Sequence, residues 1–319
     1  MTVLAEVVRS GRVEARHEGS VAAVGADGAV LASWGDLERA YFFRSSAKPF
    51  QALVCQEAGA GLLPEYLAVA CASHTGQPVH AAIVRAMLAE VGLGEEALRC
   101  PPAWPYAEAA RDRLHAEGHR RPQRIWHNCS GKHAAMLRAC LDQGWPTDSY
   151  TGPDHPLQQR IAALLADLTG QQVGPPGVDE CGVPVFPVTT LGLARAYARL
   201  AVEERLRPVA VAMHRFPALT ADAGRLAARL ATWLNAAAKG GAEANMGVAI
   251  FGRMGVAAKC WDGSFRGLGV GMLEALRQLG VLVGSADQHL TEAARPSLFG
   301  GGRPVGNVEP ALPPLEAQT

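Results

Sequence analysis

A serine and a lysine stand three residues apart in the aromatic segment Phe42–Phe50. If this segment opens a helix, Ser45 and Lys48 share one face, because positions i and i+3 are neighbours on a helix surface. A serine is a poor nucleophile until a base takes its proton, and a lysine becomes such a base once burial lowers its pKa. Ser-x-x-Lys is the arrangement of serine acyl-enzymes. The same spacing also occurs on solvated helix faces.

A second hydroxyl lies in Cys71–Gly76, where an apolar run ends in Ser73 and His74. A strand or helix that ends in this way can present Ser73 at a cleft. The alternative interpretation is an ordinary turn or helix cap, since serine and glycine favour both.

The segment His127–His133 is dominated by polar and titratable side chains and includes one thiol. Thiolate and imidazole are common zinc ligands, and Cys129 and His133 are four residues apart, so a helix could direct both toward one ion. The alternative is a helix start at which Asn128 or Ser130 is the cap.

A further cysteine, Cys181, follows Asp179 and Glu180 and precedes Gly182. This polar setting differs from that of a packed core thiol. Two cysteines and one nitrogen ligand would leave the fourth zinc position open. None of the cysteine pairs has Cys-x-x-Cys spacing, so the spacing alone supports a metal only weakly.

Two lysines in the last third of the chain are candidates for facing the serine across a cleft, as a second lysine on a sheet strand does in Ser-x-x-Lys enzymes. Lys259 lies in Gly255–Trp261, which has the composition of a strand with small neighbours. Lys239 precedes Gly240, a pattern typical of a helix C-terminus. We therefore expect Lys259 to be the distal lysine.

Strands are expected at both ends of the chain and helices between them. The predicted strands are Ser20–Val24 with Ala29–Trp34, joined by an Asp-Gly turn, and Met246–Ile250 with Gly255–Trp261. The predicted helices are Lys48–Ala58, Pro78–Val91, His133–Asp142, Pro156–Thr169, Leu191–Glu204, Leu219–Ala238 and Leu268–Leu279. This order predicts one α+β domain over residues 1–319, with an antiparallel sheet from both termini and a helical subdomain over roughly 48–238. The Gly- and Pro-rich tail 297–319 is expected to be loosely held.

The composition predicts a protein with a substantial buried core, because 49% of the 319 residues are hydrophobic and 19% are charged. Lys plus Arg and Asp plus Glu both total 30, so the net charge of zero gives no support for binding to nucleic acid or an anionic membrane. Segment 1–6 lacks the pattern of a signal peptide, and no apolar run approaches the roughly 18 residues of a membrane span. We therefore expect a cytoplasmic protein whose seven scattered cysteines are reduced.

Taken together, five segments resemble the L-asparaginase II family of the Rhizobium type, also called class 3 asparaginases. They are Arg44–Gln51, Cys71–Gly76, His127–Ala134, Asp179–Pro184 and Gly255–Gly263. The order and rough separation of these motifs fit the family over most of the chain. The resemblance implies a fold similar to serine β-lactamases and glutaminases, hydrolysis of L-asparagine to L-aspartate and ammonia, and a homodimer.

The resemblance also implies roles for the two serines. Ser45 matches the nucleophile of the family and Lys48 matches its base. Ser73 and, by our preference over Lys239, Lys259 match a second Ser-Lys pair that relays protons.

The remaining implied positions concern a metal and the substrate. Cys129, Lys132 and Cys181 match a zinc site in which a neutral lysine amine takes the place of the usual histidine, so Lys132 replaces the His133 inferred from spacing. Arg44 and Asp179 match positions near the charged groups of the substrate.

Two departures from the family pattern put the choice of substrate in doubt. Glu180 stands where a small residue is expected beside Cys181, and Ala244–Met246 replaces an expected Gly-Val. One alternative is another Ser-x-x-Lys hydrolase that acts on glutamine, a β-lactam or an ester, although the Ser-Asp-Asn triplet of penicillin-recognising enzymes is absent. A second alternative is a zinc-stabilised binding protein without catalysis.

Overall fold

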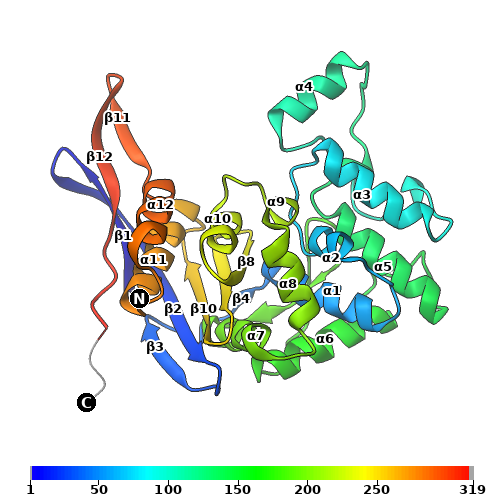
Figure 1. The fold of residues 1–319 in the computed structure, drawn as a ribbon, viewed down its shortest axis with the longest axis horizontal. Helices are drawn as coiled ribbons and strands as arrows, with labels where there is room; N and C mark the ends of the chain where they lie inside the picture. Colours follow the sequence, from blue (N-terminus) through cyan, green and yellow to red (C-terminus); the bar gives the residue numbers. More distant parts are fainter. Residues whose placement is uncertain (1, 316–319) are drawn as a thin grey trace.

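A single large antiparallel sheet combines strands from both ends of the chain in the computed structural model, which describes residues 2–315 (Figure 1). Its order is β11-β12-β1-β2-β10-β9-β8, and β3 also pairs with β2. The strands are β1 (Thr2–Arg9), β2 (Arg12–Gly25), β3 (Val30–Trp34), β8 (Ala236–Gly241), β9 (Asn245–Ile250), β10 (Met254–Cys260), β11 (Ser297–Gly300) and β12 (Arg303–Pro310). The predicted α+β class, with an antiparallel sheet flanked by helices, is confirmed.

The helices fill the middle of the sequence and its last quarter. They are α1 (Lys48–Glu57), α2 (Pro64–Ala70), α3 (Pro78–Ala89), α4 (Glu108–Ala116), α5 (Ser130–Gln143), α6 (Pro156–Thr169), α7 (Thr190–Val202), α8 (Arg207–Arg215), α9 (Pro217–Thr220), α10 (Leu226–Trp233), α11 (Phe265–Gln278) and α12 (Gly284–Ala294). Two short pairs complete the fold: β4 (Tyr41–Phe42) with β7 (Pro187–Val188), and β5 (Gly177–Val178) with β6 (Pro184–Val185).

The central strands are covered by helices on both faces. Successive side chains of a strand point to opposite sides, so neighbouring residues of one strand belong to different cores. On β2, Ala22 and Val24 belong to the core shared with α1 to α8, while Val21 and Ala23 face the core of α11 and α12. Helix α7 packs on β2, β9 and β10, and α11 packs on β1, β2 and β10. The centre of the sheet is therefore a buried layer between two sets of helices (Figure 1).

Close contact between α7 and the sheet depends on a glycine in β9. A Cβ atom at Gly247 would lie 2.3 Å from the ring of Tyr197 on α7, so no larger residue fits there. The Tyr197 hydroxyl donates a 2.9 Å hydrogen bond to the carbonyl of Ser46. This contact connects the sheet layer to the single 3-10 turn, η1 (Arg44–Ala47), that precedes α1.

The N-terminal hairpin and the pairing of β9 with β10 were predicted correctly, but the helix predicted over Leu219–Ala238 was not. Its chain forms α9 and α10, and a strand begins at Ala236. The alanines favour a helix intrinsically, but here they pack as small strand residues against β9, because tertiary context overrides propensity.

The C-terminal tail is held more firmly than predicted. Residues 297–310 form β11 and β12, and β12 pairs with β1 from Ala5 to Arg9. The last part of the predicted loose tail, 316–319, lies outside the described residues. Within 2–315, none of the helices combines the length and apolar character that a membrane crossing requires.

Candidate active site

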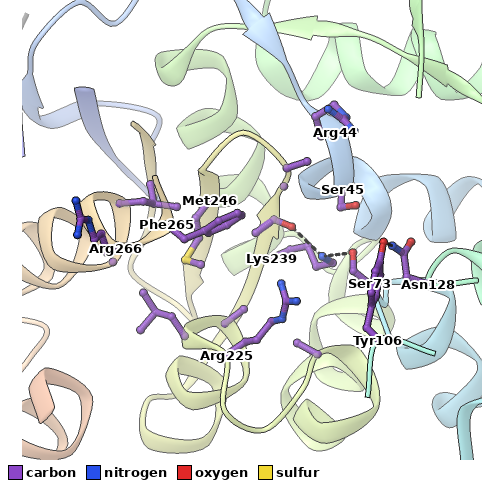
Figure 2. A pocket seen from close by; sticks show the side chains of 18 of the residues that line it. Arg44, Ser45, Ser73, Tyr106, Asn128, Arg225, Lys239, Met246, Phe265 and Arg266 are labelled. Atoms are coloured by element: carbon purple, nitrogen blue, oxygen red, sulfur yellow. Dashed lines mark hydrogen bonds between the residues drawn. The ribbon is translucent and has the colours of Figure 1, made fainter. Parts of the chain in front are cut away.

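A cavity of about 580 Å³ lies where the start of α1, the loop after α2, the β5–β6 turn and β8 meet. Ser45, Ser73, Lys239 and Asp179 all line it, and Figure 2 shows the first three around one end. The cavity thus collects side chains from four distant parts of the sequence.

Ser45 is presented to the cavity by an unusual backbone turn. Arg44, directly before it, has a φ of +50°, in the left-handed region that L residues rarely adopt. The Arg44 guanidinium donates a 2.7 Å hydrogen bond to the carboxylate of Asp179 and forms an ion pair with it. The Ser45 hydroxyl makes no hydrogen bond to any other residue in 2–315, so it is free to meet a ligand.

The buried amine of Lys48 is directed at Ser73 rather than at Ser45. It donates to the carbonyl of Ala72 at 2.6 Å and to the Ser73 hydroxyl at 3.0 Å, and the side chain is 1% exposed. The sequence spacing suggested a direct Ser45–Lys48 hydrogen bond, which the described residues do not show. In enzymes without substrate such catalytic bonds are often long.

Lys239 approaches Ser73 from the opposite side. Its amine lies 2.9 Å from the Ser73 hydroxyl and 2.8 Å from the carbonyl of Gly240 (Figure 2). Burial, followed by the charge of Lys48, lowers the pKa of Lys239 well below its usual value. The three side chains form a continuous hydrogen-bonded row, Lys48–Ser73–Lys239.

The structure does not place Lys259 beside Ser73, so the preference for Lys259 as the distal lysine is wrong. Lys259 lies on β10, two strands away from β8, and its amine donates to the carbonyls of Glu243 and Cys260. Local propensity gave no signal for Lys239, because the alanine-rich run before it favours a helix.

A second buried cluster contains the predicted metal ligands. The Lys132 amine lies 3.1 Å from the Cys181 sulfur, and the Cys129 thiol interacts with Cys181. Hydrogen bonding from Cys129 and the charge of Lys132 outweigh burial and lower the pKa of Cys181. Burial alone would lower the pKa of Lys132, but Cys181, Cys129 and Asp179 raise it. The structure therefore brings Cys129, Lys132 and Cys181 together.

His133, the ligand first inferred from spacing, borders the same cluster. Its Nδ1 is 2.6 Å from the Tyr150 hydroxyl, whereas its buried Nε2 has no partner with hydrogen-bond geometry although Cys181 lies beside it. Two thiols and an amine lie together in this cluster, with the imidazole beside Cys181, and sulfur and nitrogen are the donor types that zinc prefers. The residues present thus fit a zinc ion.

Sequence reasoning missed a different group of possible ligands at the far end of β10. His17 Nδ1 lies 2.6 Å from an Asp262 oxygen, and the Cys260 thiol lies 3.0 Å from the other oxygen. The guanidinium of Arg266 donates to His17 Nε2 at 2.9 Å, which places a positive charge beside the trio. We interpret this group as a structural hydrogen-bond network.

Other side chains that line the cavity were also missed. They are Tyr106, Asn128, Arg225, Arg266, Met246 and Phe265. Asn128 donates to the Tyr106 hydroxyl at 3.2 Å. Only the fold brings these residues to the cavity, because they come from segments up to 160 residues apart, from Tyr106 to Arg266.

A serine hydroxyl and a hydrogen-bonded lysine–serine–lysine row meet at the cavity of this α+β protein. The chain belongs to the L-asparaginase II family, which matches residues 5–310. Family membership supports amidohydrolase chemistry. No curated protein matches the chain.

Solved structures with a similar fold include two proteins whose names describe them as glutaminases. Mglu in its native form is 16% identical with a TM-score of 0.44, and the match covers 84% of this chain and 66% of Mglu. The probable glutaminase ybaS is 17% identical with a TM-score of 0.47, and the match covers 82% of this chain and 85% of ybaS. A Bacillus glutaminase is 10% identical with a TM-score of 0.46, and the match covers 84% of this chain and 92% of the Bacillus protein. At these scores the likeness carries no argument about the reaction.

Proposed function

We propose that this protein hydrolyses L-asparagine to L-aspartate and ammonia through a serine acyl-enzyme. The observation that carries the proposal is the Lys48–Ser73–Lys239 row beside the unbonded hydroxyl of Ser45 in the cavity. Membership of the L-asparaginase II family supports the same reaction.

In this mechanism the Ser45 oxygen attacks the side-chain amide carbon of asparagine. Lys48 takes the hydroxyl proton. The proton passes through the Ser73 hydroxyl to Lys239, which delivers it to the leaving nitrogen, because the three groups are already hydrogen-bonded at 3.0 and 2.9 Å. Water then attacks the ester and releases aspartate, with the same row removing its proton. Backbone N–H groups would hold the oxyanion, at about 3 kcal/mol each.

The Arg44–Asp179 pair supplies complementary charges for a free amino acid. A guanidinium binds a carboxylate in a fork geometry, and a carboxylate accepts from an ammonium group. Arg44 and Asp179 both line the cavity and are partly buried, so both can exchange their mutual contact for contacts with substrate. We assign the α-carboxylate and α-amino groups of asparagine to this end.

Zinc is part of the proposal, held by Cys129, Lys132 and Cys181. When bound, zinc would supply a Lewis acid that orients a polar group of the substrate or a water molecule. The chain's own contribution is to keep the two sulfurs and the amine together in a buried cluster next to Asp179, whose carboxylate lies 3.9 Å from the Lys132 amine.

Ammonia release from asparagine by the purified protein, with glutamine as comparison, tests the reaction. We expect Ser45→Ala to lower kcat by at least about 10⁴-fold, since removal of a nucleophile abolishes the acyl route. Ser46→Ala is the matched control, because the neighbouring Ser46 hydroxyl donates to Phe43 within the core and does not reach the cavity.

Acid quenching during turnover, followed by peptide mass spectrometry, locates the aspartyl ester. An ester on Ser45 supports the mechanism, whereas an ester on Ser73 would make Ser73 the nucleophile and Lys48 its direct base. Faster release from glutamine than from asparagine would replace the substrate but retain the reaction class. No release from either amide would favour a zinc-binding protein without catalysis.

Homodimer formation and a cytoplasmic location, expected from the resemblance and the composition, stay predictions. Sedimentation of the purified protein tests the first, and cell fractionation tests the second.

A further inference from the structure

The cavity has two chemically different halves, which meet at Lys239. The half that contains Arg44, Asn128 and Asp179 is polar. The other half is lined by the apolar side chains of Leu226, Met246, Phe265, Leu268, Ala293 and Ala294, together with Arg225 and Arg266. Figure 2 shows Lys239 in the middle, with Ser45 and Ser73 on one side and Met246 and Phe265 on the other.

The cavity as a whole is larger than free asparagine requires. A volume of about 580 Å³ lies within the range of about 300–1,000 Å³ typical of sites for drug-sized ligands. Phe265 is 50% exposed at the first position of α11, and a bound apolar group would remove that ring from water. Ammonia, the leaving group from asparagine, uses none of this surface.

The direction of proton transfer orients the scissile amide across the two halves. If the amino-acid end of the substrate occupies Arg44 and Asp179, the amide nitrogen must face Lys239, the end of the row that supplies its proton. The next residue is Gly240, which has no side chain, and a Cβ atom there would lie only 3.5 Å from Met246 and 3.9 Å from Phe265. A substituent on the nitrogen can therefore pass over Gly240 onto these two residues.

We propose that the substrates of this enzyme include aspartate β-amides whose nitrogen carries an apolar group, such as an anilide or an alkylamide. The inference rests on the function proposed above and extends it from a primary amide to secondary amides. Ser45 Oγ forms an ester bond to the carbonyl carbon, the C–N bond breaks, and the nitrogen leaves as a neutral amine with the proton from Lys239. Water then hydrolyses the ester to aspartate.

The test compares kcat/KM for L-aspartate β-anilide with kcat/KM for asparagine, using amine and ammonia release. We expect the anilide to be hydrolysed at least as efficiently as asparagine, and a β-amide with a positively charged substituent of similar size to be at least about 10-fold poorer. Phe265→Ser should lower the anilide-to-asparagine ratio on the order of 10-fold. Phe299→Ser is the control, because Phe299 is also an exposed phenylalanine but lies on β11 and outside the cavity lining.

Four outcomes separate the two proposals. Anilide hydrolysis with a ratio that depends on Phe265 supports the inference. Hydrolysis of asparagine without hydrolysis of the anilide overturns the inference and leaves the proposed function standing. If the anilide is hydrolysed but Phe265→Ser leaves the anilide-to-asparagine ratio of kcat/KM unchanged, the apolar half does not bind the anilide group and the inference is overturned. Hydrolysis of neither amide overturns both proposals.

Discussion

Arg44 has the least common backbone geometry of the residues that frame the cavity. A non-glycine residue at a φ of +50° costs about 1–3 kcal/mol, and such strain is retained where neighbouring contacts hold it. Here the Asp179 ion pair holds the Arg44 side chain, and the Tyr197 hydroxyl holds the carbonyl of Ser46. The strained turn places the Ser45 hydroxyl at the cavity wall, where it has no competing partner.

Replacement of Arg225 by Met should move the acid limb of the kcat/KM profile to higher pH. Figure 2 shows Arg225 extending toward Lys239, and the positive charge of Arg225 contributes to the lowered pKa of Lys239. The mechanism needs Lys239 neutral to accept a proton from Ser73, so activity rises as pH increases through its pKa. Without the arginine charge that pKa increases, and more of the enzyme is protonated at a given acidic pH.

The control for this change is Arg229→Met on the same stretch of chain, because Arg229 donates to the carbonyl of Gly224 and does not line the cavity. Its acid limb should match the wild type. The shift caused by Arg225→Met should shrink in high salt, since screening weakens exposed charges. If the acid limb of Arg225→Met matches the wild type at low salt, the reactive form of the enzyme does not depend on a neutral Lys239.

Strand β8 is the element on which the site depends most. It carries Lys239 and Gly240 to the cavity, and a tight turn at Glu243 and Ala244 then leads the chain into β9. Both turn residues have positive φ, +60° and +51°. The amine of Lys259, 5% exposed, donates to the carbonyl of Glu243 within this turn. Lys259 thus supports the distal lysine rather than acting as one.

We expect Lys259→Met to lower the free energy of unfolding by about 1–3 kcal/mol, because the carbonyl of Glu243 loses a charged donor in a buried setting. Urea denaturation at constant slope measures this change. Arg253→Met, at the exposed turn between β9 and β10, should leave the stability within about 0.5 kcal/mol of the wild type. If the Lys259 variant is as stable as the Arg253 variant, the hydrogen bond from Lys259 to the carbonyl of Glu243 does not stabilise the turn.

The whole molecule is organised by a sheet that needs both ends of the chain. Strands β1 and β2 pair with β12 and β10, so the N-terminal and C-terminal segments complete one layer (Figure 1). The helices α1 to α8 then form the body that holds Ser45, Ser73 and the Cys129–Lys132–Cys181 cluster. The Lys48–Ser73–Lys239 row joins the body to the sheet, since Lys239 is its one member from a strand.

Removal of zinc by chelation tests whether the proposed metal site contributes to the stability of the whole molecule. We expect the purified protein to contain zinc in equimolar amount, and Cys181→Ala to lose it because a thiolate ligand is missing. Elemental analysis measures the content, and thermal melting with and without chelator measures its contribution to stability.

Cys140→Ala is the matched control, since Cys140 is a buried cysteine on α5 and outside the cluster. It should retain zinc. Equal zinc content in the Cys181 and Cys140 variants would contradict the assigned ligands. Unfolding of the whole chain on chelation would mark the metal as structural rather than as an aid to turnover.

Local patterns in the sequence were sufficient to predict much of the fold. The Asp-Gly turn at Asp27 and Gly28 specified the N-terminal hairpin, and Gly170, which follows the predicted helix Pro156–Thr169, adopts the left-handed geometry typical of a helix end. The motifs that contain Ser45, Ser73, Cys129 and Cys181 were also recognisable. Each of these features depends on residues that are close together in the chain, so the sequence alone determined them.

The tertiary structure alone decided which lysine meets Ser73. The run from Ala236 to Gly241 has the local preferences of a helix end, whereas Lys259 lies in an evident strand, so local propensity favoured the wrong residue. Pairing of β8 with β9 and burial between helices outweigh those preferences by long-range contacts that a single sequence does not reveal. The partner of the Lys48 amine and the apolar half of the cavity depend on long-range contacts of the same kind.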